Sequence, residues 1–238
     1  MKSLLKTALR SVGVNVRRYD PTHDLAELLR LYQVAAVFDV GANAGMSGRY
    51  FRNLGFAGPL VSFEPVSRYF KLLSAEAAAD PLWTCVNAAV AEVEGEQEIN
   101  VSGGQGGASS FLNKTGTTWA SAPELDYVDH ERVRVTTIDR AAQEHYPKGD
   151  RLFLKLDVQG YERKVLEGAS QTMPRIVGVR VELSVSPTYE DEPPMFEIMN
   201  FLSQQGFRLC AIEPAWSNLK TREIYQMDGV FFRPEAAL

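Results

Sequence analysis

VFDVGANAG, residues 37–45, is the stretch that decides the fold of this chain. An apolar run that ends in an acid and a glycine-rich turn predicts a buried strand that feeds the N-terminus of a helix. Backbone N–H groups at such a turn point toward a bound ligand. Glu64 closes the next apolar run, 60–63, where a doubly wound sheet carries the acid that holds ribose hydroxyls. Together the two stretches predict a nucleoside pocket.

The spacing of the glycines indicates which nucleoside this pocket binds. A dinucleotide site needs G-x-G-x-x-G, because the glycines let the backbone approach a pyrophosphate. Asn43 and Met46 occupy the second and third glycine positions here, which disfavours a pyrophosphate. The pattern D-x-G-x-x-x-G suits a cationic amino acid joined to adenosine, with Asp39 facing its ammonium group. We therefore expect S-adenosylmethionine (SAM) as the cofactor and S-adenosylhomocysteine as its product.

Composition and charge narrow the class of protein. A length of 238 residues fits one α/β domain, and 45% hydrophobic with 23% charged residues is typical of a soluble globular protein. The net charge of -5 argues against nucleic acid as a partner, because phosphates need a basic surface. Cys85 and Cys210 lie in apolar runs and predict buried, reduced thiols. No membrane-spanning or signal segment is indicated, so a cytoplasmic location is expected.

Residues 1–34 form an N-terminal segment ahead of a single expected domain at 35–238. Lysines and arginines alternate with leucines and valines there, and the first acid is Asp20. Two interpretations stay open for this basic amphipathic stretch. It is a terminal helix docked on its own domain, or it makes a peripheral contact with an anionic membrane surface.

After this segment, strands and helices alternate along the chain. The patterns predict strands that begin at 37 or span 60–64, 83–90, 152–157 and 176–183, and helices at 24–32, 46–54, 66–79, 139–146, 161–168 and 194–206. Residues 207–212 and 225–232 predict a terminal antiparallel hairpin. Such an α/β alternation favours a mostly parallel sheet with ligands at the carboxyl ends of the strands. Seven strands with a closing hairpin resemble the architecture of Rossmann-like SAM-dependent methyltransferases, which is an argument by analogy.

The alternation breaks between the third and fourth of these strands. Residues 97–102 and 132–137 predict a β-hairpin that flanks a Gly-, Ser- and Thr-rich stretch, 103–122. A long polar loop between core strands favours a lid over the acceptor. Its hydroxyls, among them those of Ser109 and Ser110, suit a polar acceptor, and Trp119 offers an apolar face for a sugar ring.

A second group of charged residues lies on the later strands. Lys155 and Asp157 share one face of the strand at 152–157, and Arg180 with Glu182 repeat the arrangement on the next strand. We expect cross-strand pairing, because removing one partner of a buried pair costs about 3–5 kcal/mol. Asp157 and Glu182 stand at the carboxyl ends of their strands, where the pocket opens.

The chain from about residue 35 to 232 resembles the FkbM family of SAM-dependent methyltransferases. The segments that carry the resemblance are 37–45, 62–65, 87–89, 109–110, 136–139, 154–162, 165–169 and 181–183. The resemblance implies O-methylation of sugar or polyketide hydroxyls, with the acceptor bound near Lys155 and Asp157. Many members carry Glu where this chain has Gln159, which removes a carboxylate from that position.

These observations assign roles to individual residues. For catalysis we predict Asp157 as the first candidate for the base and Glu182 as the second, with Lys155 orienting or balancing them. The residues predicted to bind the cofactor are Asp39, Gly41, Ala42, Asn43, Gly45, Glu64, Pro65, Asn87, Ala88 and Asp157. The residues predicted to bind a hydroxylated small-molecule or glycan acceptor are Ser109, Ser110, Trp119, Gln159 and Tyr161.

Three alternatives remain at this point. Asp157 and Glu182 are also suitable oxygen ligands for a divalent metal such as magnesium, although this spacing alone commits to none. An NAD-dependent oxidoreductase would share the sheet and Glu64, but Asn43 and Met46 disfavour it. A catalytically silent nucleoside-binding module is disfavoured by the charged strand ends.

Overall fold

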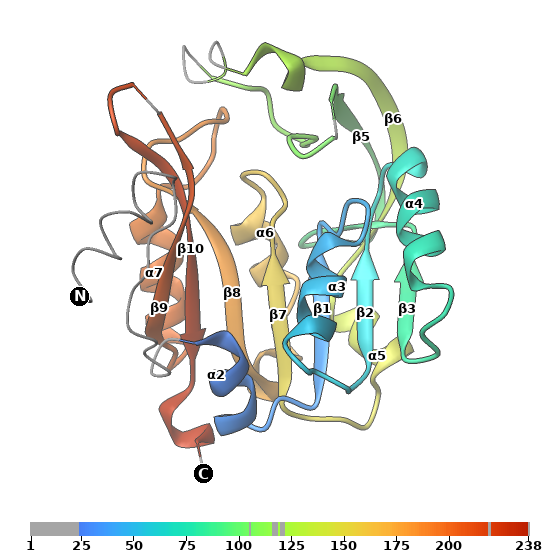
Figure 1. Ribbon diagram of the computed structural model, residues 1–238, viewed down its shortest axis with the longest axis vertical. Coiled ribbons are helices and arrows are strands. Elements are labelled where there is room, and N and C mark those ends of the chain that lie inside the picture. Colours follow the sequence, from blue (N-terminus) through green and yellow to red (C-terminus); the bar gives the residue numbers. More distant parts are fainter. Residues whose placement is uncertain (1–23, 105, 116–118, 120–121, 219, 238) are drawn as a thin grey trace, which may run out of the picture.

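The computed structural model describes residues 24–104, 106–115, 119, 122–218 and 220–237. Its main sheet has seven strands in the order β3-β2-β1-β7-β8-β10-β9 (Figure 1). Their bounds are β1 Ala36–Val40, β2 Leu60–Phe63, β3 Trp83–Val86, β7 Leu152–Leu156, β8 Ile176–Ser184, β9 Arg208–Ser217 and β10 Ile224–Phe232. Strands β1, β2, β3, β7 and β8 are parallel, and β10 pairs antiparallel with β8 and β9. The predicted fold class is confirmed.

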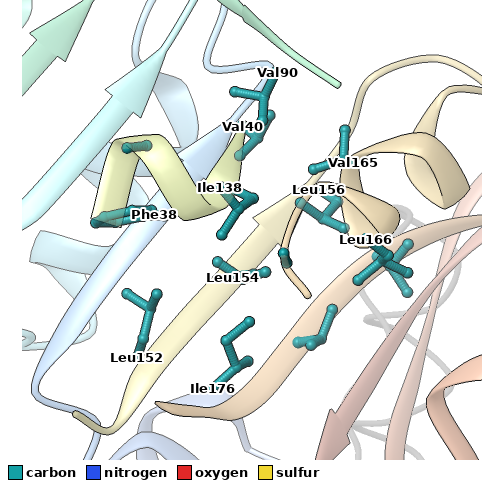
Figure 2. Close-up of a cluster of buried hydrophobic side chains, with 14 of the residues drawn as sticks. Phe38, Val40, Val90, Ile138, Leu152, Leu154, Leu156, Val165, Leu166 and Ile176 are labelled. Atoms are coloured by element: carbon teal, nitrogen blue, oxygen red, sulfur yellow. The ribbon is translucent and has the colours of Figure 1, made fainter. Parts of the chain in front are cut away.

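Helices cover both faces of this sheet. The described helices are α2 Leu25–Leu31, α3 Met46–Asn53, α4 Ser67–Ala77, α5 Ile138–His145, α6 Glu162–Glu167 and α7 Met195–Gln204. Successive strand residues point to opposite faces, so Val37 packs with the α2–α4 side while Phe38 packs with the α5–α7 side. Figure 2 shows the hydrophobic cluster on the α5–α7 side of the sheet, with Leu154 lying among side chains from β1, α5 and α6. Burial on both faces explains the continuous apolar runs of the sequence.

Local signals set the starts of three helices. Asp24 caps α2 by accepting a hydrogen bond from the N–H of Ala26 at 2.8 Å, and Thr137 caps α5 through the N–H of Arg140 at 3.0 Å. Gly45 precedes α3 with a φ of 87°, a left-handed conformation that favours glycine. Because β1 pairs parallel with both β2 and β7, the carboxyl ends of these strands lie along one edge of the sheet.

A second sheet of three strands stands above that edge. It has the order β4-β6-β5, with β4 at Ala89–Val90, β5 at Gly95–Ser102 and β6 at Tyr127–Thr136. Figure 1 shows β5 and β6 (green) curving beside the top of the main sheet. The prediction of one strand over 83–90 was wrong. The chain turns after β3, where the side-chain amide of Asn87 donates to the carbonyls of Glu64 and Pro65, and β4 then pairs with β6.

The N-terminal segment is described only from residue 24 onward, so the basic stretch that precedes it lies outside the described residues. From there, α2 docks on the domain through buried Leu25, Leu28 and Leu29. None of the helices in the described part of the chain has the length and apolar character needed to cross a membrane. Cys85 and Cys210 are thiols, and both are half-buried where full burial was predicted.

Gly48, in the middle of α3, offers a test of this packing. A Cβ at this position would lie 2.0 Å from a ring carbon of Trp83, so Gly48→Ala must push the helix away from β3. Overpacking of this kind costs about 1–3 kcal/mol. We expect a melting temperature lower by several degrees, measured by differential scanning calorimetry. Gly95→Ala is the control, since a Cβ there meets nothing within 4 Å; an equal loss in both variants would contradict the packing account.

Candidate active site

A pocket opens at the carboxyl end of the main sheet, between that sheet and the second one. Ligands of open α/β sheets bind at this end of the strands. Its walls are formed by Val40, Gly41, Asn43, Phe63, Glu64, Pro65, Ala88, Ala89, Val90, Ile99, Gly106, Gly107, Ser109, Ser110, Phe111, Asp157, Val158, Gln159 and Tyr161. The two stretches that predicted a nucleoside pocket therefore meet at one cavity.

Gly41 brings the backbone of the turn after β1 against the end of β7. Its φ is +76°, and a Cβ would lie 1.9 Å from the carbonyl oxygen of Asp157. Both the dihedral angle and the lack of space require glycine. The N–H groups of Gly41 and Ala42 donate to the carbonyl of Phe63, which ties the same turn to β2. The turn is thus fixed between the two neighbouring strands.

Glu64 is held rigidly at the rim of this turn. One carboxylate oxygen accepts a hydrogen bond from the N–H of Asn43 and the other from the N–H of Val66, each at 2.8 Å. Burial raises the pKa of Glu64 to about 7, although the two N–H groups and the charge of Lys155 favour its ionised form. Each oxygen keeps a second lone pair, so the carboxylate can accept further hydrogen bonds from a ligand.

Asp39 does not line the pocket as predicted. Its side chain is fully buried beneath the turn, where one oxygen lies 3.2 Å from Nζ of Lys155 and the other accepts a hydrogen bond from the hydroxyl of Ser62. Burial alone would lower the pKa of Lys155, but the carboxylates of Asp39 and Asp157 outweigh it and the pKa is raised. The prediction that Asp39 faces an ammonium group is corrected, because the ammonium it faces is that of Lys155.

Lys155 contacts both the turn after β1 and Asp157, the candidate base. Its Nζ donates to the carbonyl oxygen of Gly41 at 3.0 Å and lies 3.5 Å from a carboxylate oxygen of Asp157. The side chain of Asp157 is 39% exposed, whereas that of Lys155 is 8% exposed. The buried ammonium of Lys155 therefore forms an ion pair with Asp157, while part of the Asp157 carboxylate stays accessible from the pocket.

Glu182 lies behind this group on β8 and does not line the pocket. Its carboxylate accepts hydrogen bonds from the side-chain amides of Gln159 at 3.0 Å and Gln226 at 2.8 Å. Burial, followed by the nearby charges of Asp157 and Glu162, raises its pKa well above the usual value. A buried carboxyl that keeps its proton is a poor general base, so the geometry favours Asp157 over Glu182.

The expected cross-strand pairing is confirmed for Arg180 on β8, whose guanidinium lies 2.9 Å from both Asp228 on β10 and Glu213 on β9. Within the described residues, no group of three or more His, Cys, Asp or Glu side chains has the arrangement of a metal site.

The remaining predicted residues separate into two sets. Asn43, Pro65, Ala88, Ser109, Ser110, Gln159 and Tyr161 line the pocket, whereas Ala42, Gly45 and Asn87 support the turn from outside it. The hydroxyls of Ser109 and Ser110 donate to the carbonyls of Gly106 and Gln159. They therefore shape the wall, and the described part of the predicted lid forms one side of the pocket.

Trp119 is a second correction. Its side chain is buried and its indole N–H donates to the carbonyl of Thr188 at 2.7 Å. Its ring packs against Tyr189 and Trp216, in a cluster separate from the pocket. Trp119 therefore anchors the loop and offers no face to a sugar. Gly116, Thr117 and Thr118 of the same stretch lie outside the described residues.

Sequence patterns missed two aromatic contributors. Phe111 lines the pocket and packs edge-on against Tyr161, with ring centroids 5.1 Å apart. Tyr189 donates its hydroxyl hydrogen to the side-chain oxygen of Gln159 at 2.6 Å. Phe111 belongs to the inserted stretch and Tyr189 to the loop between β8 and α7, and no local pattern brings these two segments together.

The strand order, the glycine turn after β1 and the acid after β2 define a Rossmann-like SAM-dependent methyltransferase. The family model of the methyltransferase FkbM domain matches residues 39–209. The chain belongs to the FkbM methyltransferase family. This assignment also decides against the NAD-dependent alternative.

Solved structures show weaker overall similarity. An rRNA methylase from Streptococcus thermophilus is 8% identical, with 92% of this chain and 99% of that chain covered and a TM-score of 0.47. A TehB-like SAM-dependent methyltransferase from Corynebacterium glutamicum is 10% identical, with coverages of 98% and 96% and a TM-score of 0.42. A precorrin-6y C5,15-methyltransferase from Geobacter metallireducens is 14% identical, with coverages of 87% and 84% and a TM-score of 0.44. No curated protein sequence matches the chain.

Glu162 tests the electrostatics of this region. It is 2% exposed, and burial raises its pKa to about 8. Because the folded state holds this proton more tightly than the unfolded state, stability falls as the pH rises from about 4.5 to about 8. Glu162→Gln keeps an acceptor for the N–H of Val158 but carries no charge. It should melt several degrees above the parent at pH 9 and close to it at pH 5.

The exposed Glu98→Gln serves as the control for this comparison. Its melting temperature should differ from that of the parent by the same small amount at both pH values. A Glu162→Gln protein that gains nothing at pH 9 would show that the carboxyl is solvated in the folded state.

Proposed function

We propose that this methyltransferase transfers the methyl group of SAM to a hydroxyl of a sugar, glycan, glycolipid or related natural product. The observation that carries the proposal is the half-open carboxylate of Asp157 at the wall of the pocket, with Lys155 below it. An alcohol is a weak nucleophile at neutral pH, so a carboxylate within reach must take its proton.

The pocket fits SAM in two respects. Gly41 and Asn43 bring the turn after β1 to the wall of the pocket, where a ligand can approach it. Glu64 presents buried carboxylate oxygens with lone pairs to spare, as a ribose requires. When bound, SAM supplies an electrophilic methyl group. The residues that would hold it are Gly41, Asn43, Glu64, Pro65 and Ala88.

Asp157 then acts on the acceptor. Its carboxylate would orient the acceptor hydroxyl and take its proton, with the Lys155 ammonium 3.5 Å from one carboxylate oxygen. Holding the reacting groups in line supplies most of the acceleration in such a displacement. The enzyme's main task is therefore alignment, with proton removal at Asp157 Oδ1 or Oδ2.

The charge of the pocket supports an uncharged acceptor. Glu64 and Asp157 are the ionisable acids among its described lining residues, and that lining includes neither lysine nor arginine. Lys155 lies beneath this lining and already pairs with the carboxylates of Asp39 and Asp157, so no described cation in the lining is available to a phosphorylated or carboxylated acceptor. Backbone groups and the polar side chains of the inserted stretch suit a polyol.

A panel of acceptors tests the proposal. Free sugars, nucleotide sugars and glycolipids are incubated with labelled SAM, and the transfer of label is measured together with release of S-adenosylhomocysteine. We expect transfer to uncharged hydroxylated members. Exclusive transfer to amines, thiols or carbon nucleophiles would contradict the proposal.

Replacement of Glu64 tests the cofactor site. Glu64→Ala removes the acceptor expected for the ribose hydroxyls, which should weaken SAM binding by about 1–3 kcal/mol in calorimetric titration. Affinity of the parent should also fall as the pH drops below about 7, because the carboxyl then gains a proton. Glu98→Ala, on the exposed part of β5, should bind as the parent does. Unchanged affinity in Glu64→Ala would place the ribose elsewhere.

Replacement of Asp157 tests the base. Asp157→Asn preserves the size of the side chain but cannot take a proton, so turnover should fall by about 10²–10⁴-fold while SAM affinity is retained. Turnover is measured with the panel member that accepts the most label. If loss of activity merely parallels loss of thermal stability, Asp157 has a structural role instead.

A further inference from the structure

Gln159 makes more contacts with the candidate base than any pattern in the sequence suggested. Its side-chain nitrogen donates to a carboxylate oxygen of Asp157 at 2.8 Å and to one of Glu182 at 3.0 Å. The amide has two N–H bonds, so both are occupied by these carboxylates. Gln159 was predicted to bind the acceptor, but its donors are directed at protein groups.

The orientation of this amide is fixed by Tyr189. The tyrosine hydroxyl donates to the side-chain oxygen of Gln159 at 2.6 Å, and its ring is 1% exposed. A rotated amide would turn its oxygen toward the two carboxylates and lose the tyrosine, so a single orientation is favoured. Tyr189 packs in turn against Trp119 of the inserted stretch.

The backbone of Gln159 is held equally firmly. Its φ is +56°, a left-handed conformation that is uncommon for residues other than glycine. The hydroxyl of Ser110 donates to its carbonyl oxygen at 2.7 Å, and the residue is 8% exposed. Backbone and side chain of Gln159 are thus both fixed by the inserted stretch and by the loop that carries Tyr189.

We propose that Gln159 is a positioning residue, whose amide orients the Asp157 carboxylate for proton removal by tying it to Glu182. This inference rests on the proposed role of Asp157. The two oxygens of that carboxylate are then held from different sides, one by Gln159 and the other by Lys155. A neutral double donor links the two acids without adding a third charge to the group.

A double-mutant cycle tests this role. Gln159→Met keeps a similar length and the same backbone preference, but it cannot donate. With the best acceptor of the panel and labelled SAM, kcat should fall by up to about 10²-fold while KM for the acceptor and SAM affinity stay close to the parent values. In an Asp157→Asn background the same change should cost almost nothing, because the positioned group is already lost.

Two further variants serve as matched comparisons. Gln226→Met removes a donor that contacts Glu182 without contacting Asp157, so its loss in kcat should be much smaller. Tyr189→Phe retains the ring but frees the amide to rotate, and it should give a loss between those of the two glutamine variants. Tyr189→Phe also keeps the test available if Gln159→Met fails to fold.

The results separate the failure of this inference from failure of the proposed function. Equal losses from Gln159→Met in the parent and in Asp157→Asn would overturn the positioning role alone. A raised KM with unchanged kcat would return Gln159 to acceptor binding. Parent-like turnover by Asp157→Asn would overturn the proposed base, and the role of Gln159 with it.

Discussion

The buried ammonium of Lys155 is the constraint on which the rest of the site depends. It lies between the carboxylates of Asp39 and Asp157 and donates to the carbonyl of Gly41. One side chain on β7 therefore fixes the turn after β1 and the candidate base together. Removing one partner of a buried pair costs about 3–5 kcal/mol, so separating the ends of β1 and β7 would be strongly unfavourable. The ion pair therefore preserves the shape of the pocket.

More acidic side chains lie in this region than the single charge of Lys155 can neutralise. Burial raises the pKa of both Glu162 and Glu182. These two carboxyl groups therefore hold their protons to higher pH, which reduces the negative charge of the site near neutral pH. The amides of Gln159 and Gln226 supply donors to Glu182 without bringing charge. Asp157 differs from these acids in being partly exposed and in lying beside a cation. The environment thus separates one acid for chemistry from neighbours that serve the structure.

The sequence predicted the sheet and most of the pocket because both follow from local patterns. An apolar run, an acid and a glycine turn are contiguous at 37–45, and Glu64 follows the next run directly. The role of Asp39 was wrong because the partner that neutralises it, Lys155, comes from a strand more than a hundred residues away in the chain. Trp119 was wrong for the same reason, since Thr188 and Trp216 bury it from distant segments. Patterns place residues on elements, but burial depends on what packs over them.

The inserted stretch contributes both to the wall of the pocket and to the position of Gln159. Its strand β5 and the residues after it form the wall of the pocket, and its Trp119 packs on the loop that carries Tyr189. Through Tyr189 and Ser110, the same stretch sets the side chain and the backbone of Gln159. A change in the insert that altered this wall would therefore also disturb the carboxylate of Asp157. In the proposed mechanism, three hydrogen bonds couple the wall of the pocket to the base, from Ser110 and Tyr189 to Gln159 and from Gln159 to Asp157.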